Sequence, residues 1–225
     1  MSVNIAIDGP AGAGKSTVAK NTARALGCIY VDTGAMYRAM ALYLLRQGID
    51  PSDTPGIEEA CESVDITIDH EEGVQKVLLN GEDVSSLIRT EEVGKMASVS
   101  SANGRVREKL TALQKKLARE KDVVMDGRDI GTVVLPDAQV KLYLTADAHV
   151  RAERRFKELV ERGETPDIGE LERDIIERDH RDMTREISPL KRADDAILID
   201  SSALSIDETT ERITEIIREK TGLWK

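Results

Sequence analysis

The chain has 225 residues, of which 33% are charged and 40% hydrophobic, and its formal net charge at pH 7 is −10. A chain of this length buries a full hydrophobic core, so we expect residues 1–225 to form one domain, with insertions. No run approaches the roughly 18 consecutive apolar residues of a membrane span. The negative charge argues against nucleic acid or an anionic membrane as a partner.

The sequence also favours a reducing, cytoplasmic location. Cys28 and Cys61 are the only cysteines, in a chain large enough to need no disulfide, so we expect both to be buried free thiols. The first residues lead directly into a strand-like run, without the basic and then apolar segments of a secretory signal. Because no uncapped apolar stripe stands out, we expect a monomer.

The first chemical motif is GPAGAGKST, which fits the phosphate-loop pattern G-x-x-x-x-G-K-[ST]. Glycines allow the backbone to curl so that successive N–H groups point at one anion. The Lys15 ammonium suits the β and γ phosphates of a nucleotide, and the Ser16 hydroxyl suits Mg²⁺. We therefore expect a nucleoside triphosphate to be bound by Gly9, Pro10, Ala11, Gly12, Ala13, Gly14, Lys15, Ser16 and Thr17.

The segments on either side of this loop have the required form. Val3 to Asp8 is an apolar run typical of a buried parallel strand. After the loop, Ala19, Ala23 and Leu26 share one face of a predicted helix, and Gly27 is suited to cap it. A strand, a glycine loop and a helix N-terminus in this order form an anion-binding site.

Apolar runs and helical patterns alternate along most of the chain, which predicts an α/β fold with a parallel five-stranded sheet and helices on both faces. Four of the runs end in aspartate, at the strand end where such sheets bind ligands. An aspartate there serves a metal or a sugar, or only caps the next turn. The predicted strands are Ile5 to Asp8, Cys28 to Asp32, Val123 to Asp126, Val140 to Leu144, and Ala196 to Asp200.

The helix after the second strand is predicted to begin with Thr33 as its N-cap. Arg38 lies one turn into this helix, where it either reaches an anion or stays on the helix surface. A core stripe precedes Gly48 and comprises Met36, Met40, Tyr43 and Leu44.

One stretch interrupts the alternation. Val64 to Asp69 and Val74 to Asn80 are two strand-like runs joined by His70 to Gly73, and Asn80-Gly81 is a strong tight-turn signal. We expect a small antiparallel sheet inserted into the α/β fold. It is either a solvent-exposed addition or a part that closes over a second substrate.

The third strand, Val123 to Met125, leads into a charged loop. Asp126 follows the strand, where a carboxylate outside the direct ligands of Mg²⁺ is expected, and Arg128 is placed to face phosphates. The preceding helix has a core stripe of Val106, Leu110, Leu113 and Leu117.

Two arginine clusters follow. Arg151, Arg154 and Arg155 share a helix face before the polar segment 161–169, which predicts a mobile lid over residues 151–170 that brings arginines over a triphosphate. The alternative is a solvated helix face. The second cluster, on the predicted helix face of RDHRDMTR, comprises Arg178, Arg181, Asp182 and Arg185.

The second cluster suits a phosphate beside a sugar diol, because arginine forks grip phosphate oxygens and a carboxylate accepts from hydroxyls. A surface ladder of ion pairs is the alternative. Further along, Ser205 and Glu208 form a capping box that opens the last helix.

Together these segments resemble the bacterial cytidylate (CMP) kinases, which are nucleoside-monophosphate kinases with a phosphate loop, and the match runs nearly end to end. The motifs that carry it are IDGPAGAGKST (7–17), DTGAMYR (32–38), DGRDIGTVV (126–134), PDAQVKLYL (136–144), RDHRDMTR (178–185) and AILIDSS (196–202). The resemblance implies transfer of the γ-phosphoryl group of Mg·ATP to CMP or dCMP, giving CDP or dCDP and ADP. It also implies that residues 36–96 form the insert that binds the monophosphate.

Site residues implied by the resemblance fall into three groups. Arg38, Arg128 and Arg185 match positions that grip the CMP phosphate, and Asp182 and Arg178 match contacts to the ribose. Ser98, Arg107 and Asp129 match positions that read cytosine, with Thr33 near the same pocket. Asp129 suits the N4 amino donor of cytosine, while Arg107 and Ser98 suit its O2 and N3 acceptors.

The acceptor phosphate is already ionised at pH 7, so no strong general base is needed. We accordingly expect His70, His149 and His180 to be surface residues without a catalytic role. Neutralisation of developing charge is expected from Mg²⁺ and from Lys15, Arg128, Arg154, Arg155 and Arg185.

Other classes of nucleotide-binding protein remain as alternatives. A GTP-driven switch commonly has an N-K-x-D segment, and a transport ATPase has L-S-G-G-Q; neither string occurs in the sequence. A kinase of another small molecule on the same scaffold, such as shikimate or another nucleotide, is the nearer alternative.

Overall fold

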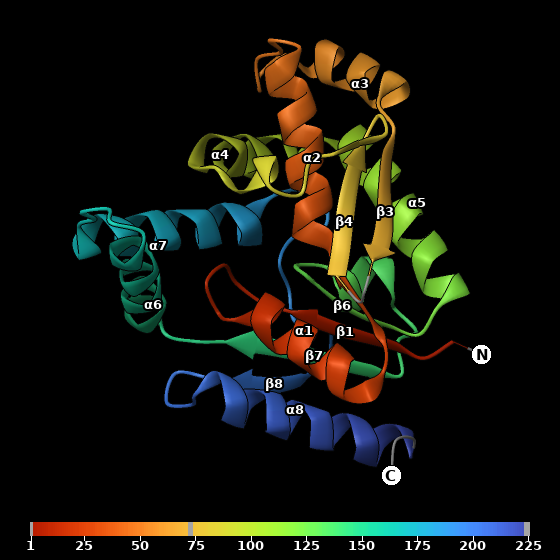
Figure 1. Ribbon diagram of the computed structural model, residues 1–225, viewed down its shortest axis with the longest axis vertical. Helices are drawn as coiled ribbons and strands as arrows, with labels where there is room; N and C mark the ends of the chain where they lie inside the picture. Colours follow the sequence, from red (N-terminus) through yellow and green to blue (C-terminus); the bar gives the residue numbers. More distant parts are fainter. Residues whose placement is uncertain (1, 72–73, 223–225) are drawn as a thin grey trace.

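The computed structural model describes residues 2–71 and 74–222. Its main sheet has five parallel strands in the order β2-β6-β1-β7-β8 (Figure 1). The strands are β1 (Asn4–Asp8), β2 (Ile29–Asp32), β6 (Val123–Gly127), β7 (Val140–Thr145) and β8 (Ile197–Asp200). All five predicted strands are confirmed to within one or two residues at each end.

Alternation along β1 explains why both faces of this sheet are covered. Ile5 and Ile7 belong to the core cluster under α1 (Lys15–Leu26) and α8 (Ile206–Thr221), which lie side by side in Figure 1. Ala6 between them belongs to a second cluster with the end of α5 (Gly104–Glu120) and the short π-helical segment η2 (Ile130–Val134). The predicted helices on both faces are therefore confirmed.

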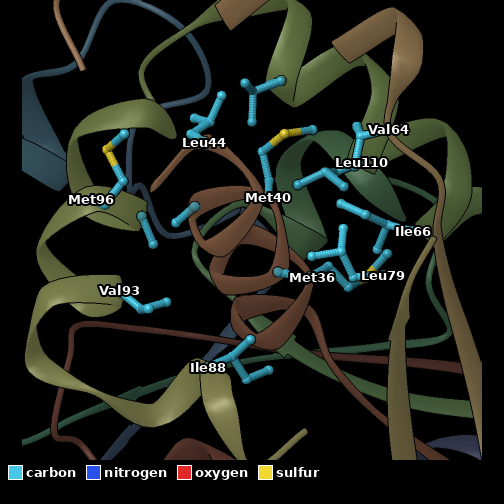
Figure 2. Packing of buried hydrophobic residues seen from close by; sticks show 14 of the residues in the cluster. Met36, Met40, Leu44, Val64, Ile66, Leu79, Ile88, Val93, Met96 and Leu110 are labelled. Carbon is cyan, nitrogen blue, oxygen red and sulfur yellow. The ribbon is translucent and has the colours of Figure 1, made fainter. Parts of the chain in front are cut away.

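The inserted part has its own core. Strands β3 (Ile66–Glu71), β4 (Val74–Leu79) and β5 (Glu82–Asp83) form a three-stranded antiparallel sheet. It packs with α2 (Thr33–Arg46), α3 (Thr54–Ser63), η1 (Leu87–Arg89), α4 (Glu91–Ser100) and α5 around one apolar cluster (Figure 2). Asn80 and Gly81 both have positive φ, at 49° and 83°, as expected of a tight hairpin turn.

Two local predictions in this region were wrong. His70 lies in β3 rather than in the turn, because the strand continues to Glu71. Asp32, not Thr33, is the N-cap of α2: its carboxylate accepts the backbone N–H of Ala35 at 2.9 Å. Aspartate and threonine are both good N-caps, so adjacent candidates are not separated by residue type.

The predicted lid region forms a helical hairpin. Helices α6 (Ala148–Glu161) and α7 (Ile168–Thr184) pack against each other and project to the left of the main sheet in Figure 1. The polar segment we identified connects the two helices. Arg185 lies one residue beyond α7, in an extended conformation, so it does not share a helix face with Arg178 as predicted.

Most other local expectations are confirmed. Gly27 caps α1 with a φ of 67°, and Ser205 with Glu208 forms the capping box of α8. Cys28 and Cys61 are both free thiols as expected, but only Cys61 is buried; Cys28 is half-buried, so the expected burial of Cys28 was wrong. Among the described helices, none is both long enough and apolar enough to cross a membrane.

The packing of α8 gives a stability prediction. Ile213 is fully buried against the main sheet, so Ile213→Ala should lower the free energy of unfolding by about 2–5 kcal/mol, from lost burial and the cavity left behind. Ile176 on α7 is 52% exposed, and the same substitution there should change stability by about 0.5 kcal/mol or less. Urea denaturation of both variants measures the difference; equal losses would contradict the assignment of Ile213 to the core.

Candidate active site

A cleft of about 650 Å³ lies at the carboxyl ends of β1, β2 and β6. The phosphate loop forms one side, α2 and α4 of the inserted part form another, and the α6–α7 hairpin contributes a third. The lining includes Lys15, Ser16 and all nine residues predicted to contact CMP: Thr33, Arg38, Ser98, Arg107, Arg128, Asp129, Arg178, Asp182 and Arg185. The structure therefore brings together residues from four of the six motifs that carry the resemblance, together with Ser98 and Arg107 from outside those motifs.

The phosphate loop has the conformation that its glycines predict. Gly12 and Gly14 have φ values of 76° and 84°, which side chains other than glycine rarely adopt. Lys15 is 5% exposed, and its Nζ donates to the carbonyl of Pro10 at 2.6 Å. Six of the nine loop residues line the cleft, whereas Gly9, Pro10 and Ala13 shape the loop from outside it.

The ammonium of Lys15 lies in a place that disfavours its charge. Burial, and next the nearby Arg128 guanidinium, lower the pKa of Lys15 to about 7. A bound polyanion removes this penalty, because an opposite charge within a few ångströms favours the charged form. Bound phosphate oxygens would therefore stabilise the charged form of Lys15, which its surroundings disfavour.

Asp126 lies at the end of β6, next to the first turn of α1. Its two carboxylate oxygens accept hydrogen bonds from Ser16 Oγ at 3.0 Å and from the Tyr30 hydroxyl at 2.9 Å. Burial, and next the carboxylate of Asp32, raise the pKa of Asp126 to about 6. This hydroxyl and carboxylate fit Mg²⁺, which takes oxygen ligands and is usually bound by one or two protein groups together with substrate phosphates.

Carboxylates hold the arginines of the cleft in place. Arg38 Nη2 donates to Asp32 at 2.9 Å, and Arg128 Nε donates to Asp182 at 2.9 Å. Arg185 Nε donates to the carbonyl of Ser188 at 2.7 Å. Arg128 also donates through Nη1 to the carbonyl of Gly127 at 3.3 Å. Each of these contacts fixes one edge of a guanidinium group, and other donors, such as Nε of Arg38 and Nη2 of Arg185, make no hydrogen bond among the described residues.

Several buried donors in the cleft make no hydrogen bond within the described chain. They are the Nε atoms of Arg38, Arg107 and Arg178, Nη2 of Arg185 and Oγ of Ser98. Burial, and next Arg128, lower the pKa of Arg178 to about 10, so this cation too gains from an anionic partner. Buried donors without partners are costly, and several of them around one cleft indicate a ligand rich in acceptors.

One part of the cleft is lined by Tyr37, Ser101, Arg107 and Asp129. Arg107 is 3% exposed; its Nη2 donates to Asp129 Oδ2 at 2.5 Å and its Nη1 to the carbonyl of Ser101 at 3.0 Å. The guanidinium carbon of Arg107 is 5.3 Å from the centre of the Tyr37 ring. Burial raises the pKa of Tyr37 to about 12. A fixed carboxylate, a fixed cation and an aromatic face provide what a flat polar base requires.

Sequence reasoning did not identify Tyr37, Asp32 or Asp8 as parts of this site. Tyr37 and Asp32 both lie within the DTGAMYR motif, and Asp8 ends the first predicted strand. The sequence pattern thus included these positions but did not indicate their contacts. Asp8 does not line the cleft: it accepts the backbone N–H groups of Ile130 at 2.8 Å and Gly131 at 2.7 Å. It fixes the segment that follows Arg128 and Asp129.

The three arginines at the start of the hairpin have different environments. Arg154 lines the cleft and donates to the carbonyl of Ser201 at 2.7 Å. Arg155 does not line the cleft; its Nη1 lies 3.1 Å from Glu158. Arg151 is buried between the phosphate loop and α7, where it binds the carbonyl of Ala11 at 2.9 Å and Asp179 at 2.7 Å.

The phosphate loop faces, across one cleft, several arginines that have unpaired donors. This is the arrangement of a phosphate-loop kinase, which holds two phosphate-bearing substrates end to end. The sequence model of cytidylate kinase matches residues 5–219. The chain therefore belongs to the cytidylate kinase family.

Individual relatives agree with this assignment. The chain is 52% identical to the cytidylate kinase of Caldicellulosiruptor bescii over 214 residues, which is 95% of each chain. It is 51% identical to that of Lactobacillus johnsonii over 218 residues, covering 97% of this chain and 95% of the relative. Among solved structures, an uncharacterised protein from Eubacterium ventriosum shares the fold, with a TM-score of 0.53 at 14% identity, covering 96% of this chain and 98% of that one.

Asp8 gives a pH-dependent prediction. Burial raises its pKa from 3.8 to about 6, so between these values the folded protein binds a proton that the unfolded chain does not. The stability that this proton contributes is lost as the pH rises through about 6. Asp8→Asn removes the titration and leaves one of two backbone donors unpaired, at a cost of about 1–3 kcal/mol near pH 7.

We expect the difference in unfolding free energy between wild type and Asp8→Asn to be larger at pH 5 than at pH 7.5, as measured by urea denaturation. Asp200→Asn is a suitable control, because Asp200 is exposed and its pKa is lowered by Ser202, so its contribution should stay constant over this range. A difference that shrinks towards pH 5 for Asp8→Asn would contradict the predicted titration.

Proposed function

We propose that this protein transfers the γ-phosphoryl group of ATP to CMP and dCMP, giving CDP or dCDP and ADP. One observation carries the proposal: a single cleft is lined by the phosphate loop, by arginines with unpaired donors, and by the Arg107–Asp129 ion pair. The family assignment supports it, because cytidylate kinases about half identical to this chain match over nearly its full length.

On the donor side, the loop from Gly9 to Thr17 binds the phosphates of ATP through its backbone N–H groups, and Lys15 reaches the β and γ phosphates. Ser16 would hold Mg²⁺ through its hydroxyl, with the Asp126 carboxylate beside it. When bound, Mg²⁺ neutralises part of the charge on the β and γ phosphate oxygens. Tyr30 keeps the Asp126 carboxylate oriented toward Ser16.

On the acceptor side, the phosphate of CMP binds Arg38, Arg128 and Arg185, which all line the cleft; Nε of Arg38 and Nη2 of Arg185 have no hydrogen-bond partner in the described chain. The ribose hydroxyls bind Asp182 and Arg178. Ion pairs such as Arg128–Asp182 and Arg38–Asp32 already hold these side chains in position, so little rearrangement is needed before a nucleotide binds.

Cytosine binds in the part of the cleft lined by Tyr37, Arg107 and Asp129. Asp129 accepts from the N4 amino group, and Arg107 with Ser98 donates to O2 and N3. Thr33 also lines the cleft, and its hydroxyl donates to the carbonyl of Asp126 at 2.7 Å. Uracil carries O4 in place of the amino group, so the Asp129 carboxylate disfavours UMP.

Catalysis follows from position and charge. An oxygen of the CMP phosphate attacks the γ-phosphorus in line, the bond to the β–γ bridging oxygen breaks, and ADP leaves with that oxygen. Lys15, Arg128, Arg154 and Arg185 neutralise the charge that spreads over the transferred group. Arg155 takes part only after a movement of the α6–α7 hairpin, which we propose to act as the lid.

We also propose that residues 36–96 act as the monophosphate-binding insert and that the protein works as a cytoplasmic monomer without nucleic-acid or membrane partners. The net charge of −10 supports the absence of polyanionic macromolecular partners. Cys28 and Cys61 as free thiols suit a reducing compartment.

A coupled assay of ADP formation with a panel of acceptors tests the function. CMP and dCMP should be phosphorylated with the highest kcat/KM, ahead of UMP, AMP and shikimate. A higher kcat/KM with shikimate or another nucleotide would favour the alternative small-molecule kinase, and tight GTP binding without transfer would favour a GTP switch.

Lys15 provides the first mutational prediction. Lys15→Ala should lower kcat by about two to three orders of magnitude, as expected when a group that neutralises transition-state charge is removed. CMP binding should change little, because Lys15 faces the donor phosphates. Steady-state kinetics with calorimetric CMP titration separates the two effects, and near-normal turnover would refute the role.

Asp129 provides the second. Asp129→Asn replaces an obligate acceptor with an amide that can also donate, so the preference for CMP over UMP should fall by about 10-fold or more. The ratio of kcat/KM for the two acceptors measures it. Because Asp129 also pairs with the buried Arg107, circular dichroism must first establish that the variant is folded. An unchanged ratio would remove Asp129 from the base pocket.

A further inference from the structure

The inserted antiparallel sheet reaches the main sheet at the open edge of β2. β2 is the outermost strand of the order β2-β6-β1-β7-β8, so one side of its backbone has no strand partner in the described chain. The start of β4 packs against this edge. An unpaired strand edge needs partners for its N–H and C=O groups.

Gln75 of β4 supplies them. Its Oε1 accepts the backbone N–H of Asp32 at 2.8 Å, and its Nε2 donates to the backbone carbonyl of the same residue at 3.3 Å. One side-chain amide thus binds both backbone groups of one residue, as a neighbouring strand does with its peptide groups.

His70 repeats the contact two residues earlier on β2. Its Nε2 lies 3.0 Å from the carbonyl oxygen of Tyr30, and because a carbonyl only accepts, Nε2 is the donor. His70 and Gln75 are opposite each other in the β3–β4 register. One cross-strand pair of the inserted sheet therefore holds both outward-facing positions of the β2 edge.

The residue held by Gln75 has its own position in the acceptor site. The Asp32 carboxylate caps α2 through Ala35 N, and its second oxygen accepts from Arg38 Nη2 at 2.9 Å. Arg38 in turn faces the cleft with a buried, unpaired Nε. A shift of the Asp32 backbone consequently moves both the start of α2 and the guanidinium group.

We propose that Gln75, assisted by His70, is a positioning residue for the acceptor phosphate, through which the inserted sheet fixes Asp32 and hence Arg38. Gln75 and His70 themselves do not line the cleft and touch no substrate. The inference rests on the proposed function, because it takes Arg38 to be a ligand of the CMP phosphate. It gives the insert a task distinct from closing over the substrate.

Steady-state kinetics of Gln75→Ala tests the proposal. Removing two hydrogen bonds that locate a phosphate-binding group should raise KM for CMP by about 5-fold or more, with KM for ATP and kcat changed by less than about twofold. Lys76→Gln is the matched control, since Lys76 is the next residue on β4 and pairs at the surface with Glu71. Its KM for CMP should match that of the wild type.

An Arg38→Met background shows whether the effect passes through Arg38. There, Gln75→Ala should raise KM for CMP no further, because the group it positions is gone. His70→Gln, which keeps an N–H donor, should retain more CMP affinity than His70→Phe. Thermal unfolding of each variant identifies any that is not folded at the assay temperature; a folded Gln75→Asn, too short to bridge both groups, then replaces Gln75→Ala.

Three results would overturn the proposal. They are an unchanged KM for CMP in the folded variant, equal increases in KM for CMP and ATP, and full additivity with Arg38→Met. A wild-type enzyme that does not phosphorylate CMP would instead overturn the proposed function, so the two failures are distinguishable.

Discussion

The structure depends on keeping several buried cations around one cleft before any phosphate is present. Burial and neighbouring positive charges both disfavour the charged forms of these groups. The pKa values of Lys15 and Arg178 are lowered mainly by burial, and the charge of Arg128 lowers both further. Asp182 counters this repulsion, since Arg128 and Arg178 hold its pKa below the ordinary value although burial alone would raise it. Ion pairs of this kind add little net stability. They hold guanidinium groups in place while part of each remains free for an anion.

Four strands of the parallel sheet carry an aspartate at or next to the carboxyl end, and each of these carboxylates has a different task. Asp126 orients the phosphate-loop hydroxyl, Asp32 holds Arg38, and Asp8 fixes the backbone after Asp129. Asp200 only closes a local turn with Ser202. Four aspartates at equivalent places in the sequence pattern thus divide between the cleft, its support and a surface turn, because the strand order puts β8 at the far edge.

Local signals explain what could be predicted from the sequence. The strands were found because short apolar runs bounded by turns need no distant information, and the phosphate loop because its residue types recur at a fixed spacing. Prediction from local signals reaches its limit at three residues, Arg151, Arg154 and Arg155. Helical spacing gives them one face, but what packs against that face comes from Asp179 and the carbonyl of Ser201, far along the chain. The end of α7 before Arg185 was likewise not marked by any cap residue in the pattern.

The same long-range contacts determine how the hairpin relates to the chemistry. Asp179 and Asp182 lie one turn apart on α7, and they bind Arg151 beside the phosphate loop and Arg128 at the end of β6. The C-terminal part of α7 is therefore tied through Arg151 to the phosphate loop and through Arg128 to the end of β6, while the connection between α6 and α7 lies farther from the main sheet. A rotation of α7 about this part changes the distance between Arg128 and Asp182. In the function proposed above, a phosphate competes with Asp182 for Arg128, so the position of the hairpin and the charge that faces the transferred group would be linked through this ion pair.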